Sequence, residues 1–255
     1  MLEALYAGAI EDAQTRRKEL RLEDLERLVN EVTPALDALA ALAPANKIKV
    51  LAEVKRASPS RGDLSSIPDP AELARVYSSN GAAAISVLTE ERRFKGSLKD
   101  LIEVRGRVDV PLLRKDFIAN EYQLLEARAF GADIFLLIVA GLDPATLRRL
   151  KRFGEDLGMV AFVETHSADE IRVALDLDAK LLGVNARDLS TFETDRNLFG
   201  RLVDMIPDGI IKVAESAVRD AKDVAHYRNA GADVVLVGEA LVTNDPAETL
   251  RSFLA

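Results

Sequence analysis

The chain has 255 residues, of which 48% are hydrophobic and 30% are charged, so it can form one α/β barrel or two small domains. A formal net charge of -8 argues against a nucleic-acid-binding surface, although backbone N–H groups can still hold an anion such as a phosphate. The chain has no cysteine and two histidines, which excludes disulfides, thiolate nucleophiles and Cys-ligated metals and leaves few ligands for zinc. We therefore expect no metal and no cofactor.

The N-terminal segment lacks the basic and apolar regions of a secretory signal, and no apolar run approaches membrane-spanning length. We expect a cytoplasmic protein that works as a monomer and binds neither a membrane nor nucleic acid. Residues 1–45 contain two apolar stripes with helical spacing, which begin at Leu2 and Leu22. These stripes predict an N-terminal helical extension that precedes the first strand.

After Pro44 the pattern changes to short apolar runs that alternate with amphipathic segments. The runs are hydrophobic almost throughout, as expected of parallel strands that are buried on both faces. Eight strands that alternate with helices are typical of a (β/α)8 barrel. The runs are Ile48–Ala52, Ala83–Leu88, Val110–Leu113, Ile134–Val139, Met159–Val163, Leu181–Val184, Ile210–Ala214 and Val234–Val237.

A short internal repeat supports this alternation. Residues 80–83 (Asn-Gly-Ala-Ala), 130–133 (Phe-Gly-Ala-Asp) and 230–233 (Ala-Gly-Ala-Asp) each precede an apolar run, and residues 177–180 (Leu-Asp-Ala-Lys) form a copy without the glycine. Each copy marks a helix that ends at a glycine and turns into a strand. We predict an α/β fold, a (β/α)8 TIM barrel forming a single domain over residues 1–255. Residues 1–45 are expected to cover the site, and the barrel is expected to have its core without them. A doubly wound open sheet is the alternative, but no Gly-x-Gly-x-x-Gly follows the first strand.

The end of the first run carries an acid and a base two residues apart, Glu53 and Lys55. Side chains alternate along a strand, so both point to the same face, where burying them is costly unless they are used. In a barrel, polar residues at the carboxyl ends of strands face the active site. Comparable residues after later runs are one of Arg114 and Lys115 by alternation, then Glu164, Asn185, Arg187, Glu215, Ser216, Gly238 and Glu239.

Other polar residues are weaker candidates for function. His166 shares the face of Glu164, but a structural or solvent role fits it better. His226 is interpreted as a surface histidine on an outer helix, and Arg92 with Arg93 as a charged loop cluster. Phe94, beside that cluster, could line a pocket.

Four segments in combination resemble indole-3-glycerol phosphate synthase of the tryptophan pathway, and the resemblance covers essentially the whole chain. They are residues 53–60 (Glu-Val-Lys-Arg-Ala-Ser-Pro-Ser), 113–117 (Leu-Arg-Lys-Asp-Phe), 183–189 (Gly-Val-Asn-Ala-Arg-Asp-Leu) and 214–216 (Ala-Glu-Ser). The resemblance implies a carboxy-lyase that acts on a phosphorylated small molecule. It would convert 1-(2-carboxyphenylamino)-1-deoxyribulose 5-phosphate to indole-3-glycerol phosphate, carbon dioxide and water.

The resemblance also implies roles for individual residues. Lys115 is the general acid for ring closure, because a ketone oxygen must be protonated, and Lys55 holds the substrate carboxylate and assists dehydration. The glutamates at 53 and 164 are acid/base candidates, while Asn185 and Glu215 orient groups in the site. The implied catalytic set is Glu53, Lys55, Lys115, Glu164, Asn185 and Glu215. The implied substrate- and phosphate-binding set is Ser58, Phe94, Phe117, Arg187, Leu189, Ser216, Ala217, Gly238 and Glu239.

The chain departs from the family pattern at two places. Ala217 stands where the family usually has glycine, so its methyl group should push the phosphate outward or force the loop into an ordinary backbone region. The chain has no tryptophan, so we expect Leu5 or Tyr6 to cover the indole ring instead.

Two alternative functions compete with this interpretation. A phosphoribosyl isomerase of the same fold would be expected to use a cysteine and an aspartate, and this chain has no cysteine. A catalytically silent phosphate-binding barrel would be expected to lack a residue such as Lys115 or Glu53, and both are present.

Overall fold

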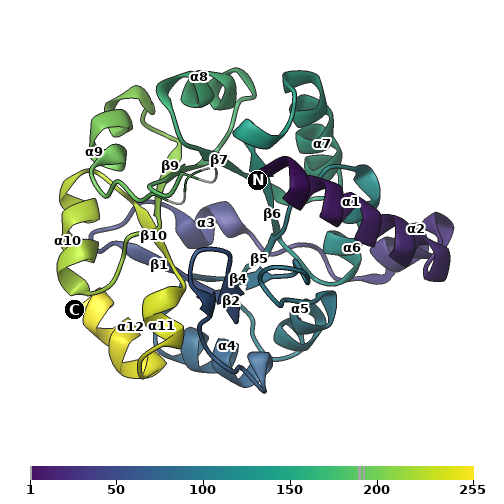
Figure 1. Cartoon of the computed structure of the whole chain (residues 1–255), viewed down its shortest axis with the longest axis horizontal. Helices are drawn as coiled ribbons and strands as arrows, with labels where there is room; N and C mark the ends of the chain where they lie inside the picture. The colour runs from purple at the N-terminus through teal and green to yellow at the C-terminus, as the bar shows by residue number, and fades with distance from the viewer. Residues whose placement is uncertain (1, 189–190, 192) are drawn as a thin grey trace.

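The fold was analysed in a computed structural model, which describes residues 2–188, 191 and 193–255. Across these residues, eight parallel strands close into a barrel in the order β1-β10-β9-β8-β7-β6-β5-β4 (Figure 1). This confirms the predicted TIM barrel. The strands are β1 (Lys49–Val54), β4 (Ala84–Leu88), β5 (Leu112–Lys115), β6 (Ile134–Ile138), β7 (Val160–Thr165), β8 (Leu181–Asn185), β9 (Ile211–Glu215) and β10 (Val234–Val237).

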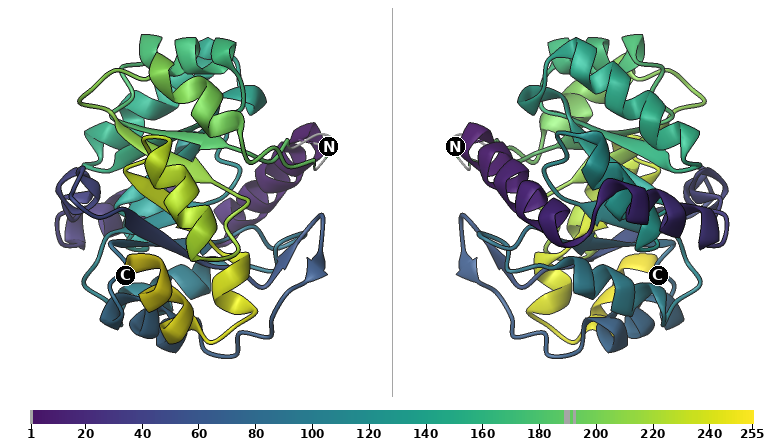
Figure 2. Two further views of the ribbon diagram at one scale, coloured as in Figure 1. Left: turned by 90° about the vertical axis from the view of Figure 1, so that its left-hand side faces the viewer. Right: turned by 90° about the vertical axis from the view of Figure 1, so that its right-hand side faces the viewer.

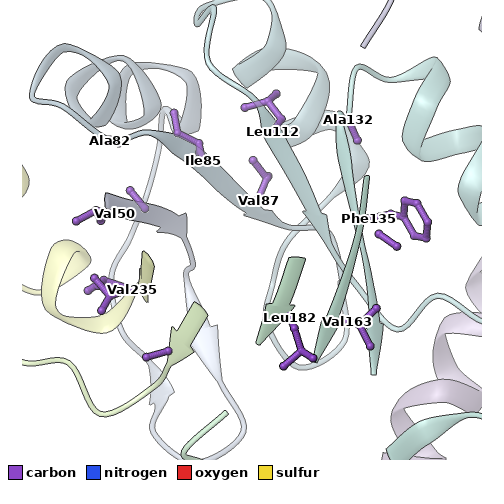
Figure 3. Packing of buried hydrophobic residues seen from close by; sticks show 14 of the residues in the cluster. Val50, Ala82, Ile85, Val87, Leu112, Ala132, Phe135, Val163, Leu182 and Val235 are labelled. Atoms are coloured by element: carbon purple, nitrogen blue, oxygen red, sulfur yellow. The ribbon is translucent and has the colours of Figure 1, made fainter. Parts of the chain in front are cut away.

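Alternation along each strand separates two apolar layers. In β1, Val50 and Ala52 pack into the layer between the strands and the outer helices, whereas Leu51 packs inside the barrel. Figure 3 shows part of the outer layer, which includes Val50, Ile85 and Leu112. Polar residues at the strand ends that share the inner parity therefore face the barrel interior.

Several strands extend beyond the apolar runs that predict them. β1 continues through Glu53, which pairs in register with Ser86, and β7 continues through Glu164, which pairs with Gly183. The backbone ladder thus includes polar residues that hydropathy alone places after the strand. The reason is that backbone pairing needs only the peptide groups, whereas these side chains face the pocket.

Helices surround the barrel, and many begin at a side chain that accepts a hydrogen bond from the first turn. Asp69, Asn120 and Ser167, for example, cap the helices that follow them. No described helix is both long and apolar enough to span a membrane. The helical segments after β1 are α4 (Pro70–Ser79), α5 (Leu98–Arg105), α6 (Glu121–Ala129), η1 (Val139–Gly141), α7 (Pro144–Asp156), α8 (Ala168–Asp176), α9 (Leu198–Leu202), η2 (Val203–Met205), α10 (Ala221–Asn229), α11 (Glu239–Val242) and α12 (Pro246–Leu254).

The repeated helix-to-strand turn has a common backbone conformation. Gly81, Gly131 and Gly231 have φ values of 100°, 93° and 99°, which favour glycine. In the copy without glycine, Asp178 takes the left-handed position with φ 56°. The repeat therefore reflects one turn geometry, and the fourth copy adopts it with a less suitable residue.

The N-terminal extension consists of α1 (Leu2–Glu19), α2 (Leu22–Glu31) and the short α3 (Ala38–Leu42). Figure 2 shows α3 at the end of the barrel opposite to the first turns of α1. Ala38 and Leu42 are fully buried in the inner core together with Leu51 and Ala84. Residues 1–45 therefore contribute to the inner core, contrary to the expectation that the barrel has its core without them, and α3 covers the amino end of the barrel.

A small hairpin follows β1 and was not predicted. It is formed by β2 (Ala57–Ser58) and β3 (Gly62–Asp63), which pair antiparallel. The hairpin and the first turns of α1 project from the same end of the molecule (Figure 2). This end holds the carboxyl ends of the strands.

Candidate active site

A cavity of about 470 Å³ opens at the carboxyl ends of the strands. All six predicted catalytic residues line it, and so do eight of the nine predicted binding residues. The ninth, Leu189, lies outside the described residues. The predicted residues in the lining are Glu53, Lys55, Ser58, Phe94, Lys115, Phe117, Glu164, Asn185, Arg187, Glu215, Ser216, Ala217, Gly238 and Glu239.

Lys115, at the end of β5, lies between two buried carboxylates. Its Nζ is 3.3 Å from Glu164 Oε2 and 3.5 Å from Glu215 Oε2, and 16% of its side chain is exposed. Burial alone would lower the pKa of Lys115, but the surrounding carboxylates, first Glu164 and then Glu215, raise it above the usual lysine value. The site therefore holds a lysine ammonium that is open to the cavity.

The two glutamates around Lys115 have opposite pKa shifts. Burial favours the neutral form of Glu164, but the Lys115 ammonium and the next neighbour, His166, hold its pKa well below the usual range. Burial raises the pKa of Glu215, and the Glu164 carboxylate raises it further despite Lys115. The two carboxyl groups therefore differ in their tendency to ionise: the surroundings of Glu164 favour its carboxylate form, and those of Glu215 favour its neutral form.

Glu215 needs space that a glycine provides. A Cβ added to Gly183 would lie 2.3 Å from Glu215 Oε1 and 2.7 Å from a ring carbon of Phe162. Gly183 belongs to the segment that resembles the family, yet nothing in its sequence context assigned it a role. Only the structure shows that Gly183 lies on β8 beside β9, the strand that carries Glu215, and therefore that a small residue is needed there.

The acid–base pair at the end of β1 faces the cavity as predicted. Lys55 Nζ lies 2.7 Å from Glu53 Oε1. A Cβ at Gly238 would lie 2.5 Å from that oxygen and 3.1 Å from the lysine nitrogen, so a side chain at this position would displace the ends of Glu53 and Lys55. Gly238 thus lets the Glu53–Lys55 pair approach the last strand, in addition to its predicted place near the phosphate.

Asn185 connects three parts of the site. Its Nδ2 donates to Glu164 Oε1 at 3.0 Å, and its Oδ1 accepts hydrogen bonds from Ser216 Oγ at 2.8 Å and from the backbone N–H of Arg187 at 3.0 Å. The loop that follows β9 is thereby tied to Glu164.

The loop after β9 keeps a glycine-like backbone in spite of Ala217. Ser216 and Ala217 both have positive φ, 68° and 58°. The expectation that alanine might force this loop into an ordinary region is therefore wrong. Hydrogen bonds from Ser216 to Asn185 and from Tyr227 to the Ser216 carbonyl, at 3.2 Å, hold the loop in place.

The lining also contains cations that sequence reasoning missed. Arg61, on the hairpin after β1, forms an ion pair with Glu239 at 2.8 Å. Arg196 and Arg219 also line the cavity, and both bind the buried Asp223. Each of these arginines lies several residues beyond the end of a strand, where alternation along the strand no longer predicts the direction of a side chain.

An aromatic wall closes one side of the cavity. The rings of Phe94 and Phe117 line it, with centroids 6.2 Å apart. Tyr6 packs edge-on against Phe117 at 5.6 Å from behind. Tyr6 and Leu5 are buried and are not among the described residues that line the cavity, so the expectation that one of them covers the ring directly is wrong.

Arg114 and Lys115 divide as alternation requires. Arg114 is fully buried outside the barrel interior, where it binds Asp116 at 2.9 Å and Glu126 at 3.2 Å. Lys115 alone faces the cavity. Arg92, interpreted as part of a charged loop cluster, instead forms ion pairs with Glu11 and Asp12 of α1.

With this geometry established, the chain was compared with known proteins. It matches the model of the indole-3-glycerol phosphate synthase family over residues 2–253. The chain belongs to this family. A curated indole-3-glycerol phosphate synthase from Leifsonia xyli subsp. xyli is 62% identical over 253 residues, which is 99% of this chain and 97% of that protein. Another, from Arthrobacter sp. strain FB24, is 52% identical over 260 residues, which is 100% of this chain and 96% of that protein.

Solved structures with low sequence identity confirm the fold alone. A 3-hexulose-6-phosphate synthase from Salmonella typhimurium has a TM-score of 0.63 at 17% identity, and the match covers 81% of this chain and 96% of that one. An N-acetylmannosamine-6-phosphate 2-epimerase from Clostridium perfringens has a TM-score of 0.63 at 14% identity, and the match covers 83% of this chain and 94% of that one.

Membership of the indole-3-glycerol phosphate synthase family gives the activity. The chain is a carboxy-lyase of tryptophan biosynthesis that converts 1-(2-carboxyphenylamino)-1-deoxyribulose 5-phosphate to indole-3-glycerol phosphate. Neither alternative function is favoured, because the family match spans the chain and the predicted catalytic residues converge on one cavity.

Proposed function

We propose that Lys115 is the general acid of ring closure. The observation that carries this proposal is the position of its Nζ, 3.3 Å and 3.5 Å from two carboxyl groups and open to the cavity. The electron-rich ring carbon attacks the ketone carbon, and the ketone oxygen takes a proton from the ammonium. Because the carboxylates keep this lysine charged, the proton is in place when negative charge develops on the oxygen.

Lys55 is proposed to bind the carboxylate that the substrate later loses as carbon dioxide. Its ammonium lines the cavity, 2.7 Å from Glu53 Oε1. After decarboxylation restores the aromatic ring, water must leave and the ring nitrogen must lose a proton. Lys55 and Glu53 lie together at the end of β1, so they can assist this last step as an acid–base pair.

Glu164 and Glu215 are proposed to divide their roles by charge. Glu164 is the carboxylate and can accept a proton during dehydration, whereas Glu215 is the neutral acid and orients groups by hydrogen bonding. Asn185 fixes Glu164 by donating to it at 3.0 Å.

The phosphate is proposed to bind between the hairpin and the last two strand ends. Ser58, Ser216 and Gly238 line this part of the cavity, and α11 begins there with its N–H groups. Phe94 and Phe117 would contact the aromatic ring at the other side. The monomeric state, the cytoplasmic location and the absence of nucleic-acid binding remain predictions.

The N-terminal extension is proposed to complete the site from outside the barrel. It reaches the cavity through Tyr6, which supports Phe117. In this proposal the extension shapes the aromatic wall, and the barrel residues make the contact with substrate.

Single-turnover kinetics can separate the proposed steps. The enzyme would be mixed with the carboxyphenylamino-deoxyribulose phosphate while carbon dioxide release and indole absorbance are followed together. If Glu164 serves dehydration, Glu164→Gln should release carbon dioxide faster than it forms indole, so that the decarboxylated intermediate accumulates. Glu215→Gln, which keeps a neutral group, should not separate the two signals. Equal slowing of both signals in Glu164→Gln would refute the dehydration role.

A further inference from the structure

His166 lies directly behind Glu164, outside the described lining of the cavity. It follows β7 on the same face as Glu164, and 13% of its side chain is exposed. Its Nε2 is 3.4 Å from Glu164 Oε1, a charge contact rather than a well-formed hydrogen bond. Its Nδ1 lies 3.2 Å from Glu170 Oε2. One imidazole ring thus bridges the carboxylate of Glu164, which lines the cavity, and that of Glu170, which is not among the described lining residues.

Glu170 is held in place independently of the cavity. Its Oε2 also accepts the backbone N–H of His166 at 2.8 Å. Ser167, the residue before α8, donates to Glu170 Oε1 at 3.3 Å and accepts the Glu170 backbone N–H at 3.2 Å. This reciprocal capping at the start of α8 anchors the carboxylate that orients the ring.

We propose that His166 is a positioning residue that keeps Glu164 ionised. The proposal deepens the assignment of Glu164 and Glu215 made above and rests on it. Glu164 has two oxygens: one faces the Lys115 ammonium, and the other faces the Asn185 amide and His166. Donors and cations on both sides favour the carboxylate form.

The two carboxylates in contact with the ring favour an imidazolium. Glu164 on β7 and Glu170 on α8 contact it, and Lys115 on β5 and Glu215 on β9 lie beyond Glu164. Burial lowers the pKa of His166, but Glu164 and Glu170 outweigh burial and raise it to about 10. The ring is therefore charged over the range in which a free histidine, with a pKa of about 6.5, loses its proton.

Nuclear magnetic resonance tests this charge without any measurement of activity. The chain has two histidines, so ring signals of ¹⁵N-histidine-labelled protein give two titrations, and a His226→Gln sample assigns them. We expect the His166 ring to stay protonated well above pH 7.5. In Glu170→Gln, which keeps the capping geometry, the titration of His166 should move to lower pH. A His166 ring that titrates near pH 6.5 in the wild-type protein would overturn the proposal.

Kinetics then test the effect on Glu164. In His166→Gln the carboxylate loses a cation, so its pKa rises and the acid limb of the kcat profile should move to higher pH. We expect kcat at pH 7 to fall roughly tenfold, less than the ~10²-fold loss typical of removing a general acid, with KM nearly unchanged. His226→Gln on the outer helix α10 is the matched control and should leave the profile unchanged.

The variants distinguish positioning from a merely structural role. A structural role would lower the thermal midpoint and leave the pH profile of the folded enzyme in place, and that result would refute the proposal. If His166→Gln does not fold, Glu170→Gln carries the same test through a smaller shift of the same limb. The nuclear magnetic resonance titration can confirm that His166 is charged while the acid limb of the kcat profile is unchanged in Glu170→Gln. That combination would refute the positioning role. The dehydration role of Glu164 would still be tested separately by the single-turnover experiment.

Discussion

Lys115 has the position and the charge that a proton donor needs: it lines the cavity, and nearby carboxyl groups favour its ammonium form. Its ammonium is open to the cavity and surrounded by carboxyl groups. Lys115→Met keeps most of the apolar stem but removes the proton donor, so we expect kcat to fall by at least ~10²-fold, as is typical of losing a general acid. Indole absorbance measures this loss, and circular dichroism checks the fold. Turnover close to that of the wild type would show that another group protonates the ketone.

Ala217 stores backbone strain beside the cavity. Its φ of 58° costs an alanine about 1 kcal/mol relative to glycine, so Ala217→Gly should raise the free energy of unfolding by up to about 1 kcal/mol. Removal of the methyl group beside the proposed phosphate site should also lower KM a few-fold, with kcat nearly unchanged, because the substrate phosphate is remote from the reacting carbons.

Asp178 offers a matched control for this prediction. It also has positive φ, 56°, but lies in the turn between α8 and β8, at the amino end of the barrel. Asp178→Gly should therefore raise stability in urea unfolding without any change in KM. If Ala217→Gly leaves KM unchanged as well, the loop already accommodates the methyl group and the family's glycine is not needed for binding.

At the residue scale, the sequence predicts which face of a strand a side chain occupies better than it predicts which groups that side chain contacts. Alternation correctly placed Glu53 with Lys55 and allowed only one of Arg114 and Lys115 into the barrel. It could not show that His166 lies against Glu164, because the parity of a residue past the strand end does not fix where its ring packs. Nor could it show which carboxyl of a pair carries the proton, since that depends on the sum of several contacts.

At the scale of elements, α1 is linked to β5, the strand that carries Lys115, by a chain of ion pairs. Arg16 binds Glu126 of α6 at 2.6 Å and 2.9 Å, and Glu126 binds Arg114 of β5 at 3.2 Å. Arg114 in turn binds Asp116, so the two residues that flank Lys115 belong to this network. The network therefore connects the N-terminal helix to the strand end that carries the proposed acid.

Arg16→Met should weaken this link. Methionine keeps apolar contact but removes two charged hydrogen bonds, so we expect the free energy of unfolding to fall by roughly 2 kcal/mol and kcat to fall a few-fold. Urea unfolding and steady-state kinetics measure the two effects. Arg17→Met is the matched control, because Arg17 is the next residue on the same helix and is exposed. Equal losses in both variants would mean that the effect belongs to the helix rather than to the ion pairs.

At the scale of the whole molecule, periodicity was sufficient to predict the barrel. Eight apolar runs and four copies of one turn define the number and direction of the strands, because each copy ends a helix and starts a strand. The closure of the amino end by α3 was not predictable. Its sequence, Ala38–Leu42, is short and uniformly apolar, and only tertiary contacts show which surface it covers.

Truncation separates the two functions of the extension. Removing residues 1–31 deletes α1 and α2 and should leave a folded barrel with lower kcat/KM, because Phe117 loses the support of Tyr6. Removing residues 1–45 also deletes α3. That loss exposes the inner core and removes Leu42, whose burial alone is worth about 1.5–3 kcal/mol, together with the hydrogen bond from Lys49 Nζ to the Ala41 carbonyl at 2.7 Å.

The longer truncation should therefore unfold at a clearly lower urea concentration than the shorter one, and much of it should be unfolded or aggregated at 37 °C. Circular dichroism in urea compares the two midpoints, and Leu42→Ala in the full-length chain is the point-mutation control. That variant should lose roughly 3 kcal/mol while α1 and α2 remain in place. Equal midpoints for the two truncations would show that the barrel closes without α3, and the extension would then serve only the aromatic wall of the active site.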